Sequence, residues 1–180
     1  MKKILVVILA LFIITGCDMM DNKAKMSVQE YLDNYKELND DVEKQLETVI
    51  NREGFNDGQR AIYKDIMERQ YKNLEYEITN EKYDGNKATI TAKITVYDYY
   101  KAQEQIADYL KNHREEFYKD GEYDENSYIN YKLNTMKNYK ERVTYSIDFE
   151  LDKKDNNWVI KDLKLDDIEK IHGIYDYSNN

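Results

Sequence analysis

The spacing of hydrophobic residues changes along the chain, and the first pattern is helical. From Ser27 onward apolar side chains recur at intervals of three and four residues, which is the spacing of one face of an α-helix. They are Val28, Tyr31, Leu32, Tyr35, Leu38, Val42, Leu46, Val49 and Ile50. Ser27 and Glu30 form the S-x-x-E pattern of a helix capping box. The pattern predicts one long amphipathic helix that begins at Ser27 and ends near Gly54.

A second helix followed by a β-hairpin is predicted next. The helix starts at about Asp57, and its inner side carries Ile62, Tyr63, Ile66, Met67, Gln70, Tyr71 and Leu74. From Leu74 the period falls to two, and alternation resumes after Asp84-Gly85-Asn86 and continues to Tyr97. Asp-Gly between two alternating runs is typical of a tight turn, because turn residues there must tolerate positive φ.

The second half of the chain repeats this order of elements. Asp98 is expected to cap a helix with Ala102, Ile106, Tyr109, Leu110 and Phe117, and a polar loop at 120–122 precedes a shorter helix near 126–139. A second hairpin pairs 143–151 with 158–163 through a turn at 152–157, and a short helix starts at Asp166. The prediction is an α+β domain, with helices packed on one face of a curved four-stranded antiparallel sheet.

The N-terminal segment has the pattern of an export signal. Lys2 and Lys3 precede an apolar run from Ile4 to Ile14, which is too short to span a bilayer core that needs roughly 20 apolar residues. Ile14-Thr15-Gly16-Cys17 resembles the lipobox of bacterial lipoproteins, although leucine is commoner than isoleucine at its first position. The resemblance implies that Cys17 receives a thioether-linked diacylglycerol, with palmitate among its acyl chains, and becomes the N-terminus. An ordinary secretory signal and an uncleaved anchor are the alternatives.

This organisation divides the chain into three parts. Residues 1–16 are the predicted signal peptide, 17–26 are the lipidated cysteine and a polar tether, and 27–175 form a single domain. The order of elements resembles the cystatin-like and nuclear-transport-factor-like folds found in small lipoproteins of Gram-positive bacteria. That resemblance implies a fold and carries over no functional residue, because such folds host enzymes, binding proteins and accessory domains.

Charge and cysteine content exclude several partners and cross-links. The chain has 27 basic and 36 acidic residues, and loss of Lys2 and Lys3 leaves a net charge of −11. Nucleic-acid binding is excluded because it requires clustered Lys and Arg, which are interspersed here with acidic residues. Anionic headgroups repel such a surface, so membrane contact is expected through the lipid on Cys17 alone. As the only cysteine, Cys17 leaves the domain without a disulfide.

No familiar catalytic or metal-binding pattern is present. None of the serines lies in G-x-S-x-G, and His113 and His172 lack partners at H-x-x-x-H spacing. The acidic run from Asp120 to Asn126 fails as an EF-hand, since its sixth and twelfth positions are Glu125 and Tyr131. A looser oxygen-ligand site there stays open beside the simpler reading of a solvated loop. We therefore predict no catalytic residue, metal or cofactor.

Two groups of side chains are candidates for binding. Tyrosines cluster after the first hairpin and around the acidic loop, and small polar residues form one strand face. The tyrosines are Tyr97, Tyr99, Tyr100, Tyr123, Tyr128 and Tyr131, and the strand face carries Thr89, Thr91, Lys93, Thr95, Thr144 and Ser146. Tyrosines of this kind are suited to stacking on sugars or peptides, although core tyrosines such as Tyr31, Tyr35 and Tyr145 show that the residue is used throughout.

These patterns favour a membrane-tethered extracytoplasmic module without enzymatic activity. Its expected ligand is an envelope protein, a cell-wall fragment or a small molecule, bound at the sheet face or in the pocket between sheet and helices. The alternative is a small hydrolase or isomerase that uses Asp or Glu in the concavity of the sheet. A buried carboxylate within hydrogen-bonding reach of His113 or a tyrosine, in a closed pocket, would favour that alternative.

Overall fold

The computed structural model describes residues 18–178, with side chains from residue 23 onward. The elements are α2 (Asp18–Glu37), α3 (Asp40–Arg52), α4 (Asp57–Lys72), β1 (Glu75–Asp84), β2 (Lys87–Tyr97), α5 (Tyr99–Asn112), η2 (Arg114–Phe117), β3 (Tyr118–Lys119), β4 (Glu122–Tyr123), α6 (Glu125–Asn138), β5 (Arg142–Lys154), β6 (Asn157–Ile160) and α7 (Leu165–His172). The predicted signal peptide and the lipid site at Cys17 lie outside this range. Within it, no helix combines the length and apolar character needed to cross a bilayer.

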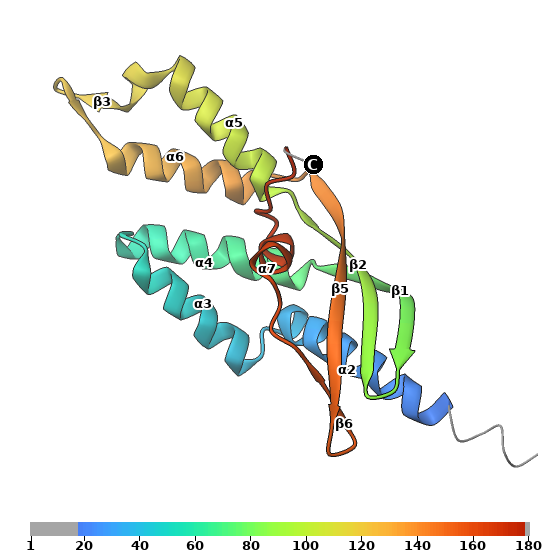
Figure 1. Ribbon diagram of the computed structural model, residues 1–180. Helices are drawn as coiled ribbons and strands as arrows, with labels where there is room; N and C mark the ends of the chain where they lie inside the picture. Colours follow the sequence, from blue (N-terminus) through green and yellow to red (C-terminus); the bar gives the residue numbers. More distant parts are fainter. Residues whose placement is uncertain (1–17, 179–180) are drawn as a thin grey trace, which may run out of the picture.

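Four antiparallel strands form the sheet in the order β1-β2-β5-β6 (Figure 1). The strands β2 and β5 pair from Lys87–Asp152 to Tyr97–Arg142, so every second residue of both strands faces the same side. That side is apolar and buried: β2 contributes Ala88, Ile90, Ala92, Ile94 and Val96, and β5 contributes Tyr145, Ile147, Phe149 and Leu151. The α+β class and the antiparallel sheet are as predicted.

Both hairpins close through two-residue turns. In the first hairpin the turn is Gly85-Asn86, and Gly85 has a φ of 58°, as predicted for this glycine. Asp84 is the last residue of β1 and pairs with Lys87, so only the glycine of the Asp-Gly signal has a positive φ. In the second hairpin, β5 continues to Lys154, and the turn is Asp155-Asn156, with φ values of 48° and 62°. Positive φ at both central residues gives a twist that matches the strands, so the predicted turn at 152–157 shortens to two residues.

The predicted long helix is wrong in two respects. It is interrupted at Leu38, whose φ is 51°, and Asn39 then caps α3 by accepting a hydrogen bond from the Val42 amide at 3.0 Å. The helix also begins at Asp18, before the predicted start at Ser27, so the expected tether is helical from that residue. The Ser27 hydroxyl lies within α2 and caps nothing; it donates to the carbonyls of Lys23 and Trp158, both at 3.1 Å.

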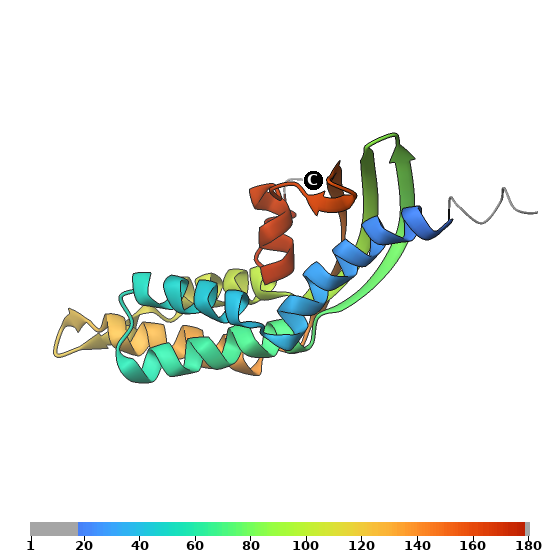
Figure 2. The ribbon, with the colours of Figure 1, turned by 90° about the horizontal axis from the view of Figure 1, so that it is seen from below.

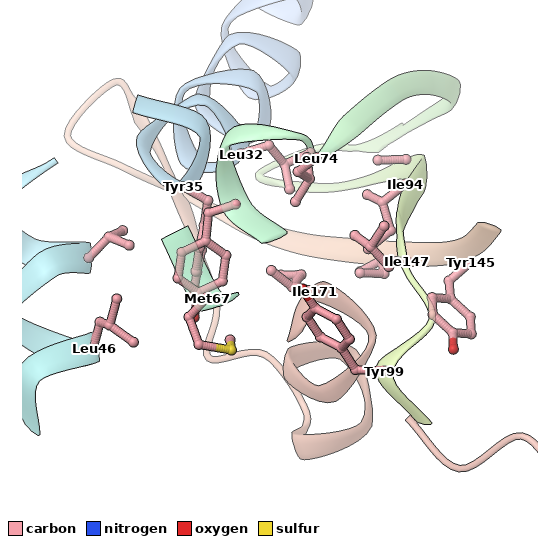
Figure 3. Packing of buried hydrophobic residues seen from close by; sticks show 14 of the residues in the cluster. Leu32, Tyr35, Leu46, Met67, Leu74, Ile94, Tyr99, Tyr145, Ile147 and Ile171 are labelled. Atoms are coloured by element: carbon pink, nitrogen blue, oxygen red, sulfur yellow. The ribbon is translucent and has the colours of Figure 1, made fainter. Parts of the chain in front are cut away.

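Helices α3, α4, α5 and α6 extend beyond one end of the sheet, and we call these four helices the arm (Figure 1). Helix α2 runs along the sheet (Figure 2), where Val28 and Leu32 are fully buried, and α7 contributes Ile171 to the same core. Figure 3 shows Leu46 of α3 set apart from the sheet residues Ile94 and Ile147. The core is thus shared between the sheet and the base of the arm.

Local sequence signals explain where the arm helices begin. Asn56 and Gln59 form a reciprocal capping box at the start of α4, with both hydrogen bonds at 3.0 Å. Asp98 caps α5 as predicted, accepting from the Lys101 amide at 3.0 Å. Phe117, expected on the same helix, belongs instead to the short 3₁₀ turn η2.

Candidate functional site

An apolar groove of about 350 Å³ lies within the arm, and we call it the helical groove. The arm helices pack in the order α5-α6-α4-α3, which leaves α3 and α5 as the outer helices. Both outer helices and both inner ones contribute to the lining, and one end is closed by His172, the last residue of α7, and by Ile174, which follows the helix. The lining residues are Tyr35, Val42, Gln45, Leu46, Val49, Glu53, Phe55, Tyr63, Met67, Tyr71, Gln103, Lys132, Leu133, Met136, His172 and Ile174.

Helical periodicity places these side chains on one surface. On α4, Tyr63, Met67 and Tyr71 follow one another at intervals of four residues and therefore share a face. On α3, Val42, Leu46 and Val49 recur at intervals of four and three residues and also share a face, and Val49 remains 44% exposed at the edge of the groove. The groove therefore joins a buried inner part to an open apolar rim.

A tyrosine–histidine pair supplies the polar group at the α7 end. The Tyr71 hydroxyl lies 2.8 Å from Nδ1 of His172. Burial lowers the pKa of His172 to about 4, so the ring is uncharged at neutral pH. Burial also raises the pKa of Tyr71, so its hydroxyl keeps its proton. Tyr35 packs edge-on against Tyr71 with ring centroids 5.1 Å apart, which shields the pair with a further aromatic face.

Gln70 fixes the position of α7 against the arm and the sheet. Its side chain is fully buried and donates to the carbonyls of Tyr97, at 3.0 Å, and His172, at 2.8 Å. Its Oε1 accepts from the Tyr97 amide at 2.8 Å. The chain then turns at Gly173, whose φ of 73° suits glycine, and whose Cα faces Tyr97 and Gln70 closely. One amide thus links α4, β2 and α7.

The tyrosines after the first hairpin do not form a binding groove. Tyr99 is fully buried, and Tyr97 stacks against it with ring centroids 6.1 Å apart. The Arg69 guanidinium lies 4.1 Å from the centre of the Tyr97 ring, and Tyr100 packs on Tyr177 at 4.9 Å. These rings serve packing at the junction of sheet and arm.

The second predicted tyrosine group does come together, at the outer end of the arm. Tyr131 stacks on Tyr109 at 4.6 Å, and Tyr128 and Tyr123 lie 6.5 Å apart between ring centroids. Tyr128 also lines a shallow, more open depression that shares Gln103 and Lys132 with the helical groove. Phe117 packs edge-on against Tyr128 and Tyr131, so most of this cluster is internal packing.

The candidate histidine and acidic loop have structural roles. His113 stacks on Tyr109 at 4.1 Å, where α5 ends. Asp124 caps α6, and hydrogen bonds from the Ser127 hydroxyl and amide lower the pKa of that carboxyl group. Within residues 18–178, no group of three or more acidic, histidine or cysteine side chains is arranged to hold a metal ion.

One buried carboxylate, Asp98, lies within hydrogen-bonding reach of a tyrosine, which is one part of the condition set for the enzyme alternative. It lines none of the cavities among the described residues, so the other part, a closed pocket, is not met. Asp98 accepts a hydrogen bond from the Tyr177 hydroxyl at 2.7 Å, in addition to capping α5. It does not line the helical groove. Asp98 therefore holds the C-terminal segment against the start of α5, and its contacts explain its burial.

The polar strand face is largely satisfied by its own hydrogen bonds. Thr91 donates to Asp148 at 2.7 Å, and the Thr95 and Thr144 hydroxyls lie 2.9 Å apart. A polar cavity of about 590 Å³ lies between this face and the segment leading into α7. Two of its lysines are paired locally, since Lys161 lies 3.1 Å from Glu150 and Lys170 lies 2.8 Å from Asp167, and the rest of its lining is mainly polar or charged. The helical groove is therefore the better candidate for a ligand site, although it is the smaller of the two.

Comparison of the chain with protein-family models, with curated proteins and with solved structures found no match.

Proposed function

We propose that this chain is a membrane-tethered extracytoplasmic module that binds a small, mainly apolar ligand in the helical groove. The observation that carries the proposal is the groove itself, with about 350 Å³ lined chiefly by aliphatic, aromatic and methionine side chains. Ligand pockets in proteins are typically ~300 to 1,000 Å³ and mostly apolar, with a few placed polar groups. His172 and Tyr71 are such groups.

The tether in this proposal is the lipid on Cys17. Two acyl chains suffice for stable anchoring, and a tethered module meets its partners at a raised local concentration. The first described residue of α2 is Asp18, which follows Cys17 directly in the sequence. The chain would thus hold the groove at the cell envelope, where it can take up or present its ligand.

Binding can be tested with propylbenzene, an uncharged probe smaller than the groove. We expect propylbenzene to raise the melting temperature of the full-length protein in phospholipid nanodiscs, measured by circular dichroism, because a ligand that binds only the folded state stabilises it. Val49→Trp, which places an indole at the rim of the groove, should abolish most of that rise.

Thr48→Trp is the matched control for this experiment. Thr48 is an exposed, β-branched residue of the same helix and does not line the groove. The Thr48→Trp variant should therefore show the same rise in melting temperature with propylbenzene as the wild-type protein. The proposal is overturned if propylbenzene leaves the melting temperature of the wild-type protein unchanged, or if the two tryptophan variants respond alike.

A further inference from the structure

We propose that the ligand of the helical groove is an uncharged amphiphile, with an alkyl or aromatic body and one carbonyl-type acceptor that bonds to Nε2 of His172. This inference rests on the proposed function and specifies the chemical class of the ligand. It is carried by the hydrogen-bond geometry at the α7 end of the groove, and by the distribution of polar groups along its lining.

The contact with Tyr71 determines which ring nitrogen of His172 carries the hydrogen. A neutral imidazole has one N–H and one lone pair. Among the described residues, the His172 ring is the only acceptor within hydrogen-bonding distance of the Tyr71 hydroxyl, which lies 2.8 Å from Nδ1. A buried hydroxyl that donates to Nδ1 leaves the hydrogen on Nε2. The second ring nitrogen is therefore a donor, and its ring lines the groove.

No described protein group accepts from that second nitrogen. The hydrogen bonds of His172 are the Nδ1 contact with Tyr71 and the backbone carbonyl bond from Gln70. Two aromatic rings flank the imidazole, with the Tyr35 centroid 6.4 Å and the Tyr71 centroid 5.6 Å from the His172 ring centroid. Nε2 of His172 is not among the buried polar atoms without a partner, and His172 is only partly buried, so this nitrogen reaches solvent through the groove. A ligand carbonyl can take the place of water at this donor while its apolar body fills the groove.

The remaining polar residues of the lining argue against a charged head at this depth. Gln45 and Glu53 are exposed, and Gln103 and Lys132 are partly exposed, so they belong to the rim. A carboxylate at His172 would have to lose its water shell among Tyr35, Met67 and Leu133 with only a neutral partner. The acidic balance of the chain further disfavours an anion. A ketone, ester or amide oxygen meets the donor without these costs.

Three compounds of matched size test this assignment: propylbenzene, phenylacetone and phenylacetate. Full-length protein in phospholipid nanodiscs is titrated with each, and dissociation constants are measured by calorimetry. We expect phenylacetone to bind about fivefold more tightly than propylbenzene, the effect of one neutral hydrogen bond, and phenylacetate to bind most weakly. His172→Phe should remove the preference for phenylacetone and retain propylbenzene binding, whereas His113→Phe should leave both affinities unchanged.

A nitrogen-15 spectrum of the wild-type ring makes the test independent of how well His172→Phe folds. Phenylacetone should shift the resonance of the protonated Nε2 of His172, and propylbenzene should leave it in place. Equal affinity for the two compounds, or tightest binding of phenylacetate, would overturn this inference and leave the proposed function standing. If none of the three compounds binds, the proposed function itself falls.

Discussion

Among the glycines in residues 18–178, Gly173 is the one at which an added side chain meets the closest contacts. Its φ is 73°, and a Cβ atom there would collide with the Tyr97 carbonyl and the Gln70 side-chain amide. We expect Gly173→Ala to lower the free energy of unfolding by about 3 kcal/mol, since it combines left-handed backbone strain with overpacking. Urea denaturation followed by circular dichroism measures the change.

Gly121 provides the matched control for that substitution. Its φ is also positive, at 86°, but an added Cβ would meet no atom within 4 Å. Gly121→Ala should therefore cost only the backbone term, about 1 kcal/mol. Equal losses in the two variants would show that the contact with Gln70 and Tyr97 contributes nothing.

His172 makes stability depend on pH in a defined direction. Its pKa is about 4 in the folded protein, because burial disfavours the charged ring, against 6.5 for the ordinary side chain. The unfolded state therefore binds more protons between these values, and the free energy of unfolding should fall as pH drops from about 6.5 toward 4. Above pH 6.5 the histidine is neutral in both the folded and the unfolded state, so His172 no longer makes the free energy of unfolding depend on pH. Urea denaturation across this range should show a shallower fall for His172→Phe than for His113→Phe or the wild type.

At the scale of single elements, the break between α2 and α3 is what gives the groove its α3 wall. Asn39 is the N-cap of α3, and the acidic residues Asp40, Asp41 and Glu43 occupy its first turn. We expect Asn39→Ala to lower the free energy of unfolding by about 1 kcal/mol, and Asn39→Asp to preserve it, because aspartate also caps. Thermal denaturation of both variants is the measurement. An alanine variant as stable as the wild type would mean that the cap does not hold the break.

The sequence predicted most elements but not this break, for a physical reason. Leu38 continues the apolar stripe of α2, and neither Gly nor Pro marks the interruption, so the periodicity runs through it. The available signal was Asn39 followed by acidic residues, which is typical of a helix start. The hairpins were predictable because alternation and turn chemistry act within a few residues.

The groove was not predictable from the same patterns. Leu46, Met67 and Met136 stand at apolar positions with the spacing expected of ordinary core residues. These residues line a groove because all four arm helices contribute side chains to it, with α3 and α5 as the outer helices. That arrangement results from packing between segments that are distant in the sequence. The pair of Tyr71 and His172 likewise joins residues far apart in sequence. The local spacing of apolar residues therefore predicts neither the groove nor the contact between Tyr71 and His172.

The whole molecule separates the end nearest Cys17 from the ligand site. Helix α2 starts at Asp18, and Tyr35 near its other end lines the groove. At 1.5 Å per residue the helix spans about 30 Å, comparable to the hydrocarbon core of a bilayer. In Figure 1 the start of α2 lies at one end of the molecule, and the arm extends from the other end. Where α2 stands upright on the bilayer, a lipid on Cys17 holds the groove about 30 Å from the membrane surface, and the ligand arrives from the aqueous side.

The anchor on which this arrangement depends has its own prediction. Cys17→Ser removes the thiol that a diacylglycerol would modify, so the variant should accumulate as an unlipidated precursor that still contains residues 1–16. Metabolic labelling with palmitate, combined with intact-protein mass spectrometry, measures both changes. Thr15→Ala keeps a small residue beside Gly16 and should be labelled and processed like the wild type. A serine variant that reached the mature mass and carried the lipid label would exclude Cys17 as the anchor. The groove would then retain its binding properties in the nanodisc experiments, but its position at the envelope would need another explanation.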